Sequence, residues 1–94
     1  MLPKTLLTIV SEAALEDKLI DEIMSVGAKC YTISDARGRG THGVRSGKWS
    51  ESGNIRIEVI GDAELCARIA TRLNDTYEKN YALMMYTSVV EIQT

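Results

Sequence analysis

The sequence contains no phenylalanine and only one proline, one histidine and one tryptophan. Because phenylalanine is absent, the hydrophobic core has to be built mainly from leucine, isoleucine, valine and methionine. No apolar run reaches the roughly 18 residues that a membrane-spanning helix needs. The first ten residues also lack the layout of a secretory signal, since the apolar stretch 5–10 is short and the acidic Glu12 follows it. The sequence therefore predicts a cytoplasmic protein.

Groups that carry catalysis or bind metals are scarce. The two cysteines, Cys30 and Cys66, lie on different expected elements without CxxC spacing, which favours buried, reduced thiols over a disulfide or a metal site. His42 is the only histidine, and no serine is expected to meet it on an ordered element. The carboxylates around Glu16 fit a solvated helix start. These absences predict a protein that is not an enzyme and has no cofactor and no metal site.

The charge of the chain is unevenly distributed. The formal net charge is −2, which does not indicate a nucleic-acid partner. Four basic residues nevertheless fall within twelve positions that contain no acid: Arg37, Arg39, Arg45 and Lys48. Without these four, seven basic residues face thirteen acidic ones, a balance of −6. One basic segment therefore lies on an otherwise acidic protein.

Local patterns predict six elements of secondary structure. Alternating or β-branched residues predict strands over 5–10, 28–36, 55–59 and 82–92. Ser11 is expected to cap a first helix that ends at Gly27, and Asp62 to cap a second helix. The second helix has an expected buried stripe of Leu65, Ile69, Leu73 and Tyr77. The order β-α-β-β-α-β predicts an α+β fold, a ferredoxin-like sandwich with two helices on one face of a four-stranded antiparallel sheet.

The length fits a single domain over residues 1–94. A domain of this size is marginally stable alone, and the sheet face without helices needs a cover. Three subunits that pack these faces around an axis would supply one. We therefore expect a homotrimer, although the pattern alone does not set the symmetry.

The segment 38–53 differs from the rest of the chain in composition. It holds five of the seven glycines and almost no apolar residues, which predicts a long loop outside the packed domain, mobile when empty. Glycines allow backbone N–H groups to approach an anion, and arginine binds phosphate through paired hydrogen bonds. Arg45 is the first candidate phosphate ligand, with Arg39 and His42 as additional anion contacts; a flexible solvated loop is the alternative. Trp49 fits either a loop anchor or a partner contact.

Two motifs resemble a known family. The run 32–40, TISDARGRG, and the pattern Gly38-Arg39-Gly40-Thr41 followed by Arg45 are similar to the PII signalling proteins. The closest resemblance is to the PII-like branch associated with bicarbonate transporters and carboxysomes. Residues 81–86 resemble the last strand of that branch. In the family, the segment that corresponds to 38–53 is the T-loop.

The resemblance implies a sensor that binds adenine nucleotide in clefts between subunits: AMP or ADP, with ATP or cyclic AMP less favoured, and bicarbonate as a further candidate ligand. Ile9 and Ile60 would flank the base, and Thr32 would bind it. The other implied contacts are Gly38, Gly40, Thr41, Arg45, Leu83 and Met84, the last two from the neighbouring subunit. The T-loop would regulate a partner in inorganic-carbon uptake or fixation, such as a bicarbonate transporter, so that contact with a membrane is indirect.

The chain departs from the nitrogen-regulatory members of the family. Residues 74–81 contain no glycine and residues 38–53 contain no tyrosine, although those members have both. We therefore do not expect nitrogen sensing by their route. The alternative function is that of a trimeric metal-binding protein of the copper-tolerance type, which shares the architecture, but one histidine and two separated cysteines make a poor metal site. A small catalytic ferredoxin-like domain, such as an isomerase, would need a pocket acid or base.

Overall fold

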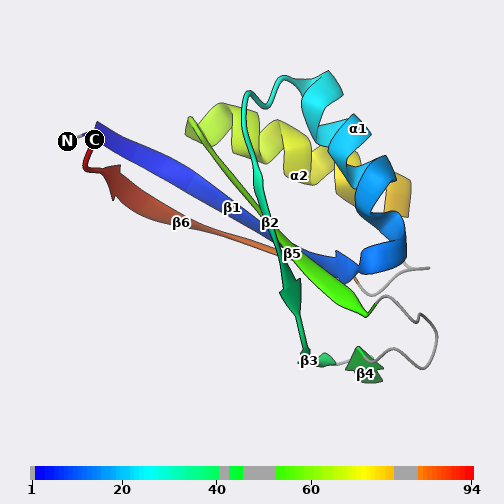
Figure 1. The fold of residues 1–94 in the computed structure, drawn as a ribbon. Helices are drawn as coiled ribbons and strands as arrows, with labels where there is room; N and C mark the ends of the chain where they lie inside the picture. The colour runs from blue at the N-terminus through cyan, green and yellow to red at the C-terminus, as the bar shows by residue number, and fades with distance from the viewer. Residues whose placement is uncertain (1, 41–42, 46–52, 78–82) are drawn as a thin grey trace.

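A computed structural model describes residues 2–40, 43–45, 53–77 and 83–94. Its elements are β1 (Leu2–Glu12), a 3₁₀ turn η1 (Ala13–Leu15), α1 (Glu16–Val26), β2 (Thr32–Ala36), β3 (Gly38–Gly40), β4 (Gly43–Arg45), β5 (Asn54–Gly61), α2 (Ala63–Tyr77) and β6 (Met84–Ile92). The main sheet has the strand order β2-β5-β1-β6, with every neighbouring pair antiparallel. Figure 1 shows α1 and α2 together on one face of this sheet. The predicted ferredoxin-like sandwich is confirmed.

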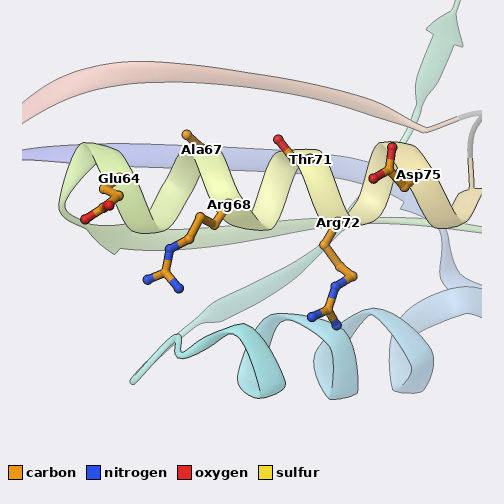
Figure 2. A pocket seen from close by; sticks show the side chains of 6 residues that line it. All are labelled: Glu64, Ala67, Arg68, Thr71, Arg72 and Asp75. Carbon is orange, nitrogen blue, oxygen red and sulfur yellow. The ribbon is translucent and has the colours of Figure 1, made fainter.

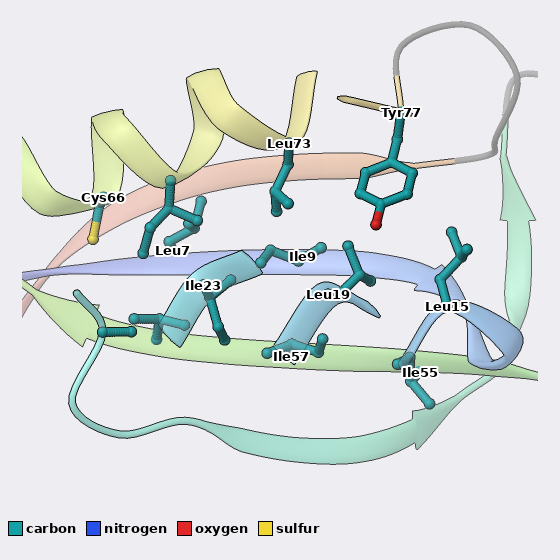
Figure 3. Packing of buried hydrophobic residues seen from close by; sticks show 13 residues of the cluster. Leu7, Ile9, Leu15, Leu19, Ile23, Ile55, Ile57, Cys66, Leu73 and Tyr77 are labelled. Atoms are coloured by element: carbon teal, nitrogen blue, oxygen red, sulfur yellow. The ribbon is translucent and has the colours of Figure 1, made fainter. Parts of the chain in front are cut away.

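The core lies between the helices and one face of the sheet. On β5, Ile55, Ile57 and Val59 are buried, and they alternate with Arg56 and Ile60, which are exposed. Successive residues of a strand point to opposite faces of the sheet. Ile55, Ile57 and Val59 therefore lie on the face that the helices cover. Leu19 and Ile23 of α1 and four residues of α2 belong to the same cluster, much of which Figure 3 shows: Cys66, Ile69, Leu73 and Tyr77.

Two of the three predicted helix ends agree with the structure. Asp62 caps α2 as expected, because its Oδ1 accepts a hydrogen bond of 2.7 Å from the Leu65 N–H. Gly27 ends α1 with φ 127°, a left-handed conformation that favours glycine. The expected Ser11 cap is wrong, since β1 continues to Glu12 and the Ser11 hydroxyl donates to the Glu12 carbonyl oxygen at 3.2 Å.

Strand boundaries and one cysteine also differ from expectation. The first strand is longer than predicted because residues 2–4 pair with β6 and residues 11–12 pair with β5. The second is shorter, since only Thr32–Ala36 pairs with β5. Residues 28–31 connect α1 to the sheet, and Cys30 within them is exposed. Cys66 is buried, as predicted, and both thiols are free.

The second face of the sheet carries no helix in the described chain, and we refer to it as the open face. Ile60, Met84 and Tyr86 lie on it and are 41%, 44% and 50% exposed. Thr8, between β5 and β6 on the same face, is buried by its neighbours. The open face thus presents apolar side chains to the outside of the chain.

Part of the expected long loop is regular. Gly38–Gly40 and Gly43–Arg45 form a separate antiparallel ladder, in which Gly38 pairs with Arg45 and Arg39 with Val44. This β3–β4 ladder extends from the end of β2, away from the two helices (Figure 1). Residues 41–42 and 46–52, including His42 and Trp49, lie outside the described residues. Neither described helix combines the length and hydropathy needed to cross a bilayer.

Candidate functional site

A hollow of about 170 Å³ lies on the open face where the β3–β4 ladder leaves the sheet. All four strands of the main sheet and the segment that follows β2 contribute to it. Its lining residues are Val10, Ala36, Arg37, Gly38, Asn54, Arg56, Met84 and Tyr86. We refer to it as the open-face hollow.

Strand register brings these residues together. Val10 of β1 pairs with Arg56 of β5 on one side and with Met84 of β6 on the other. Ala36 of β2 pairs with Asn54, two residues before Arg56 on the same face. Val10, Arg56 and Met84 therefore form one row across the sheet, and Ala36 leads directly into Arg37 and Gly38.

The hollow has a cationic side and an apolar side. Arg37 and Arg56 are exposed, and neither forms an ion pair with any residue in the described parts of the chain. Val10, Met84 and Tyr86 supply apolar surface. Two carboxylates lie on the same face, Glu58 two residues after Arg56 and Glu12 opposite Asn54, but neither lines the hollow. The arrangement suits an anionic ligand that has an apolar portion.

The structure brings some of the expected nucleotide-binding residues to this hollow. Gly38 lines it, and so does Met84 of the same chain, which the resemblance assigns to the neighbouring subunit. Gly40 and Arg45 lie in the adjoining ladder, where the backbone of Arg45 is next to Gly38. Leu83 is half-buried and packs against the core cluster. Thr41 lies outside the described residues.

Two further expected contacts lie elsewhere on the same face. Thr32 pairs with Glu58, and Ile60 is two residues beyond Glu58, so both side chains lie toward the other end of β2 and β5. Thr32 is six residues from Gly38, which corresponds to roughly 20 Å of extended chain. Within one chain, Thr32 and Ile60 are therefore separate from the hollow.

The implied role of the Ile9 side chain does not agree with its position. Ile9 is 0% exposed and packs in the core beneath the helices, whereas Ile60 lies on the open face. The two side chains of one chain cannot flank one base, because they lie on opposite faces of the sheet. Val10, the next residue, lines the hollow instead. The run 5–10 has no strict polar–apolar alternation, so the sequence did not reveal which of its residues face inward.

Sequence reasoning also missed Arg56 and Tyr86. Arg56 falls within the predicted strand 55–59 and Tyr86 within the predicted strand 82–92, and neither pattern marks them as ligand contacts. The available signal was the alternation of β5, which places Arg56 on the face of the sheet away from the buried Ile55 and Ile57. That signal identifies the face but not the neighbours of Arg56 on adjacent strands.

Two other hollows have different character. One of about 330 Å³ runs along the outer surface of α2 and is lined by residues of both charges, among them Glu64, Arg68, Arg72 and Asp75 (Figure 2). Arg72 there is neutralised by Glu22 of α1 at 2.8 Å. Another of about 270 Å³ lies beside Lys4, Asp62 and Val89. Neither contains a residue expected from the sequence to bind nucleotide.

The thiol of Cys66 lies in the core of the described chain. Burial raises the pKa of the Cys66 thiol, and the nearby charge of Asp62 acts in the same direction. The thiol therefore favours its neutral, unreactive form, and Sγ lies 3.6 Å from the Thr5 carbonyl oxygen. Among residues 2–40, 43–45, 53–77 and 83–94, no group of three His, Cys, Asp or Glu side chains could hold a metal ion.

Comparison with known proteins agrees with this architecture. The family profile described as Nitrogen regulatory protein P-II matches residues 4–94. The crystal structure of a protein from Thermus thermophilus, assigned as a PII-like signaling protein, is 42% identical, with a TM-score of 0.79 over 95% of this chain and 87% of that chain.

More distant structures share the fold. CPII from Thiomonas intermedia K12, a nitrogen regulatory PII-like protein bound to ADP, AMP and bicarbonate, is 22% identical, with a TM-score of 0.84 over 99% of this chain and 91% of its own. A DUF3240 family protein from Shewanella baltica OS155 is 16% identical, with a TM-score of 0.68 over 100% and 94% of the two chains. Because the profile spans nearly the whole sequence and one relative is 42% identical, this chain belongs to the P-II family of signalling proteins, in its PII-like group.

Proposed function

We propose that this protein is a non-catalytic sensor that binds an adenine nucleotide, AMP or ADP in preference to ATP or cyclic AMP, in clefts between its subunits. The observation that carries the proposal is the pairing of Gly38 with Arg45 at the rim of the open-face hollow. It joins a glycine, which lets a ligand approach the backbone, to the strand that carries the expected phosphate ligand. CPII, a relative of the same fold, binds ADP, AMP and bicarbonate.

The size of the hollow supports a site shared between subunits. Pockets for ligands of nucleotide size usually measure about 300–1,000 Å³. The hollow is about 170 Å³, so one chain encloses only part of such a ligand. A second subunit on the open face would supply the remaining wall and would cover Ile60 and Tyr86. We therefore propose a homotrimer, with Leu83 and Met84 contributed across the cleft.

The β3–β4 ladder and the loop after it would carry the output. Ligand binding at the base of the ladder can favour one of two orientations of the ladder. The shift in their populations is limited by the difference between the ligand's affinities for the two orientations. We propose that this T-loop, within a single domain over 1–94, regulates a cytoplasmic pathway of inorganic-carbon uptake or fixation, with a bicarbonate transporter as the candidate partner. Bicarbonate is the candidate second ligand.

The experiment is calorimetric titration of AMP, ADP, ATP, cyclic AMP and adenosine into the protein and two variants. Arg45→Ala should weaken binding of AMP and ADP about tenfold or more, because a charge-assisted hydrogen bond is lost, and leave adenosine nearly unaffected. Arg68→Ala, a change of the same charge on α2, should bind like the wild type. A wild-type protein that binds none of these compounds would overturn the proposal, and equal AMP affinities for wild type and Arg45→Ala would remove Arg45 from the site.

A further inference from the structure

The outer side of α2 carries a groove that the proposed nucleotide site does not use. It is the hollow of about 330 Å³ along this helix, and we refer to it as the α2 groove. Its lining residues recur at the three- and four-residue spacing of a single helix face: Glu64, Ala67, Arg68, Thr71, Arg72 and Asp75. All six are exposed, whereas Cys66, Ile69 and Leu73 between them are buried in the core.

The sizes of the side chains give the α2 groove its shape. Figure 2 shows Arg68 and Arg72 extending toward α1, while Ala67 and Thr71 project from the other side of the helix. Ala67 and Thr71 are short and one helical turn apart, so another segment can approach the backbone of α2 closely between the longer side chains. The groove spans three turns, roughly 16 Å at 1.5 Å per residue. A straight groove of this length along one helix suits a second helix laid beside it.

The charges of the groove are basic at its centre and acidic at both ends. Arg72 is already held by Glu22 of α1 at 2.8 Å. Within the described parts of the chain, neither Arg68 nor Asp75 forms an ion pair. Asp75 lies in the last turn of α2, which contains no basic residue and where the helix dipole disfavours a negative charge. A carboxylate beside Arg68 and a cation beside Asp75 would therefore both be stabilised.

This order of charges argues against a second copy of α2 as the occupant. An antiparallel copy in register would bring Glu64 opposite Asp75. It would also bring Arg68 opposite Arg72, so that like charges meet along the whole groove. A parallel copy in register would place every charge opposite itself. The complementary helix instead has acidic side chains at its centre and a basic side chain at each end.

We propose that the α2 groove is a docking surface for a helix of a different protein, with two acidic residues at its centre and one basic residue at each end. The central carboxylates would pair with Arg68 and the exposed edge of Arg72, and one basic end would pair with Asp75. Because α2 covers the face of the sheet opposite to the open face, the groove stays accessible in the proposed trimer (Figure 1). Docking there goes beyond nucleotide binding and does not require it.

The test uses two synthetic alanine-rich helical peptides of identical composition as probes. One carries Lys, Glu, Glu and Lys at the spacing of the four charges of the groove, and the other carries Glu, Lys, Lys and Glu at the same places. In ¹H–¹⁵N correlation titrations of the full chain at low ionic strength, the first peptide should cause saturable shifts at the Ala67, Arg68 and Thr71 amides, and the second should bind more weakly. Arg68→Glu should weaken binding of the first peptide about two- to thirtyfold, because reversal replaces a modest attraction by a repulsion. Lys18→Glu, the same charge change at an exposed position of α1, is the matched control and should leave the affinity unchanged.

The outcomes separate this surface from the other possibilities. A gain in affinity of Arg68→Glu for the second peptide, whose charges are reversed, would support the docking surface. Equal affinities of the wild type for the two peptides, saturable binding of neither, or an unchanged affinity of Arg68→Glu would overturn it. Self-association of the free protein beyond the trimer that Arg68→Glu abolishes would assign the groove to a second copy and overturn the proposed partner. Failure of the wild type to bind AMP would contradict the proposed function alone, since the peptide titrations contain no nucleotide.

Discussion

The open face offers a sharp test at Ile60. Complete burial of an isoleucine side chain stabilises by about 1.5–3 kcal/mol. With Ile60 41% exposed in the single chain, covering the rest contributes about 0.6–1.2 kcal/mol per subunit. Ile60→Ala should therefore weaken subunit association mildly. Ile60→Glu should abolish it at micromolar concentration, because a buried carboxylate costs several kcal/mol and each change of about 1.4 kcal/mol alters an equilibrium constant tenfold.

Val89 provides the matched control. It is 77% exposed and lies one position from Ser88, which pairs with Leu6 beside Ile60, so its side chain points to the opposite face. Val89→Glu should leave association unchanged. Light scattering after gel filtration measures the mass, with three times 10.4 kDa expected for wild type and Val89→Glu and one chain for Ile60→Glu. A folded Ile60→Glu protein that keeps the wild-type mass would show that the open face is not the association surface.

Four further predictions concern the chain itself. Asp62→Ala should lower the free energy of unfolding in urea by about 1 kcal/mol through loss of the α2 cap, while Asp62→Asn keeps most of it. Leu73→Ala, at a fully buried site, should lower it by about 2–5 kcal/mol, and a smaller loss would contradict the packing in Figure 3. Because burial raises the pKa of the Cys66 thiol above its ordinary 9.0, the neutral thiol favours the folded state, so stability should fall as pH rises past 9.0 and Cys66→Ala should lack that fall. In native protein a thiol reagent should modify Cys30 quickly and Cys66 only on unfolding, and equal rates would contradict their different exposures.

The sequence was sufficient for features that depend on neighbouring residues. The cap at Asp62 and the end of α1 at Gly27 each involve groups within four positions, so local chemistry determines them. The alternation of β5 from Ile55 to Val59 and the helical stripe of α2 depend only on the period of each element. Their order along the chain is the order of the ferredoxin-like sandwich. The concentration of glycine and arginine after β2 likewise marked the segment that contributes to the hollow.

The tertiary structure decided what depends on pairing between distant residues. Ile9 and Val10 are both β-branched and adjacent, and only the register of β1 between β5 and β6 decides that Ile9 enters the core and Val10 lines the hollow. The pairing of β2 with β5 likewise brings Arg56 to the hollow that Ala36 and Gly38 also line. A shift of one residue in either register would move each side chain to the other face, because side chains alternate along a strand. Such registers are selected by burial across the whole sheet, which no local segment of sequence contains.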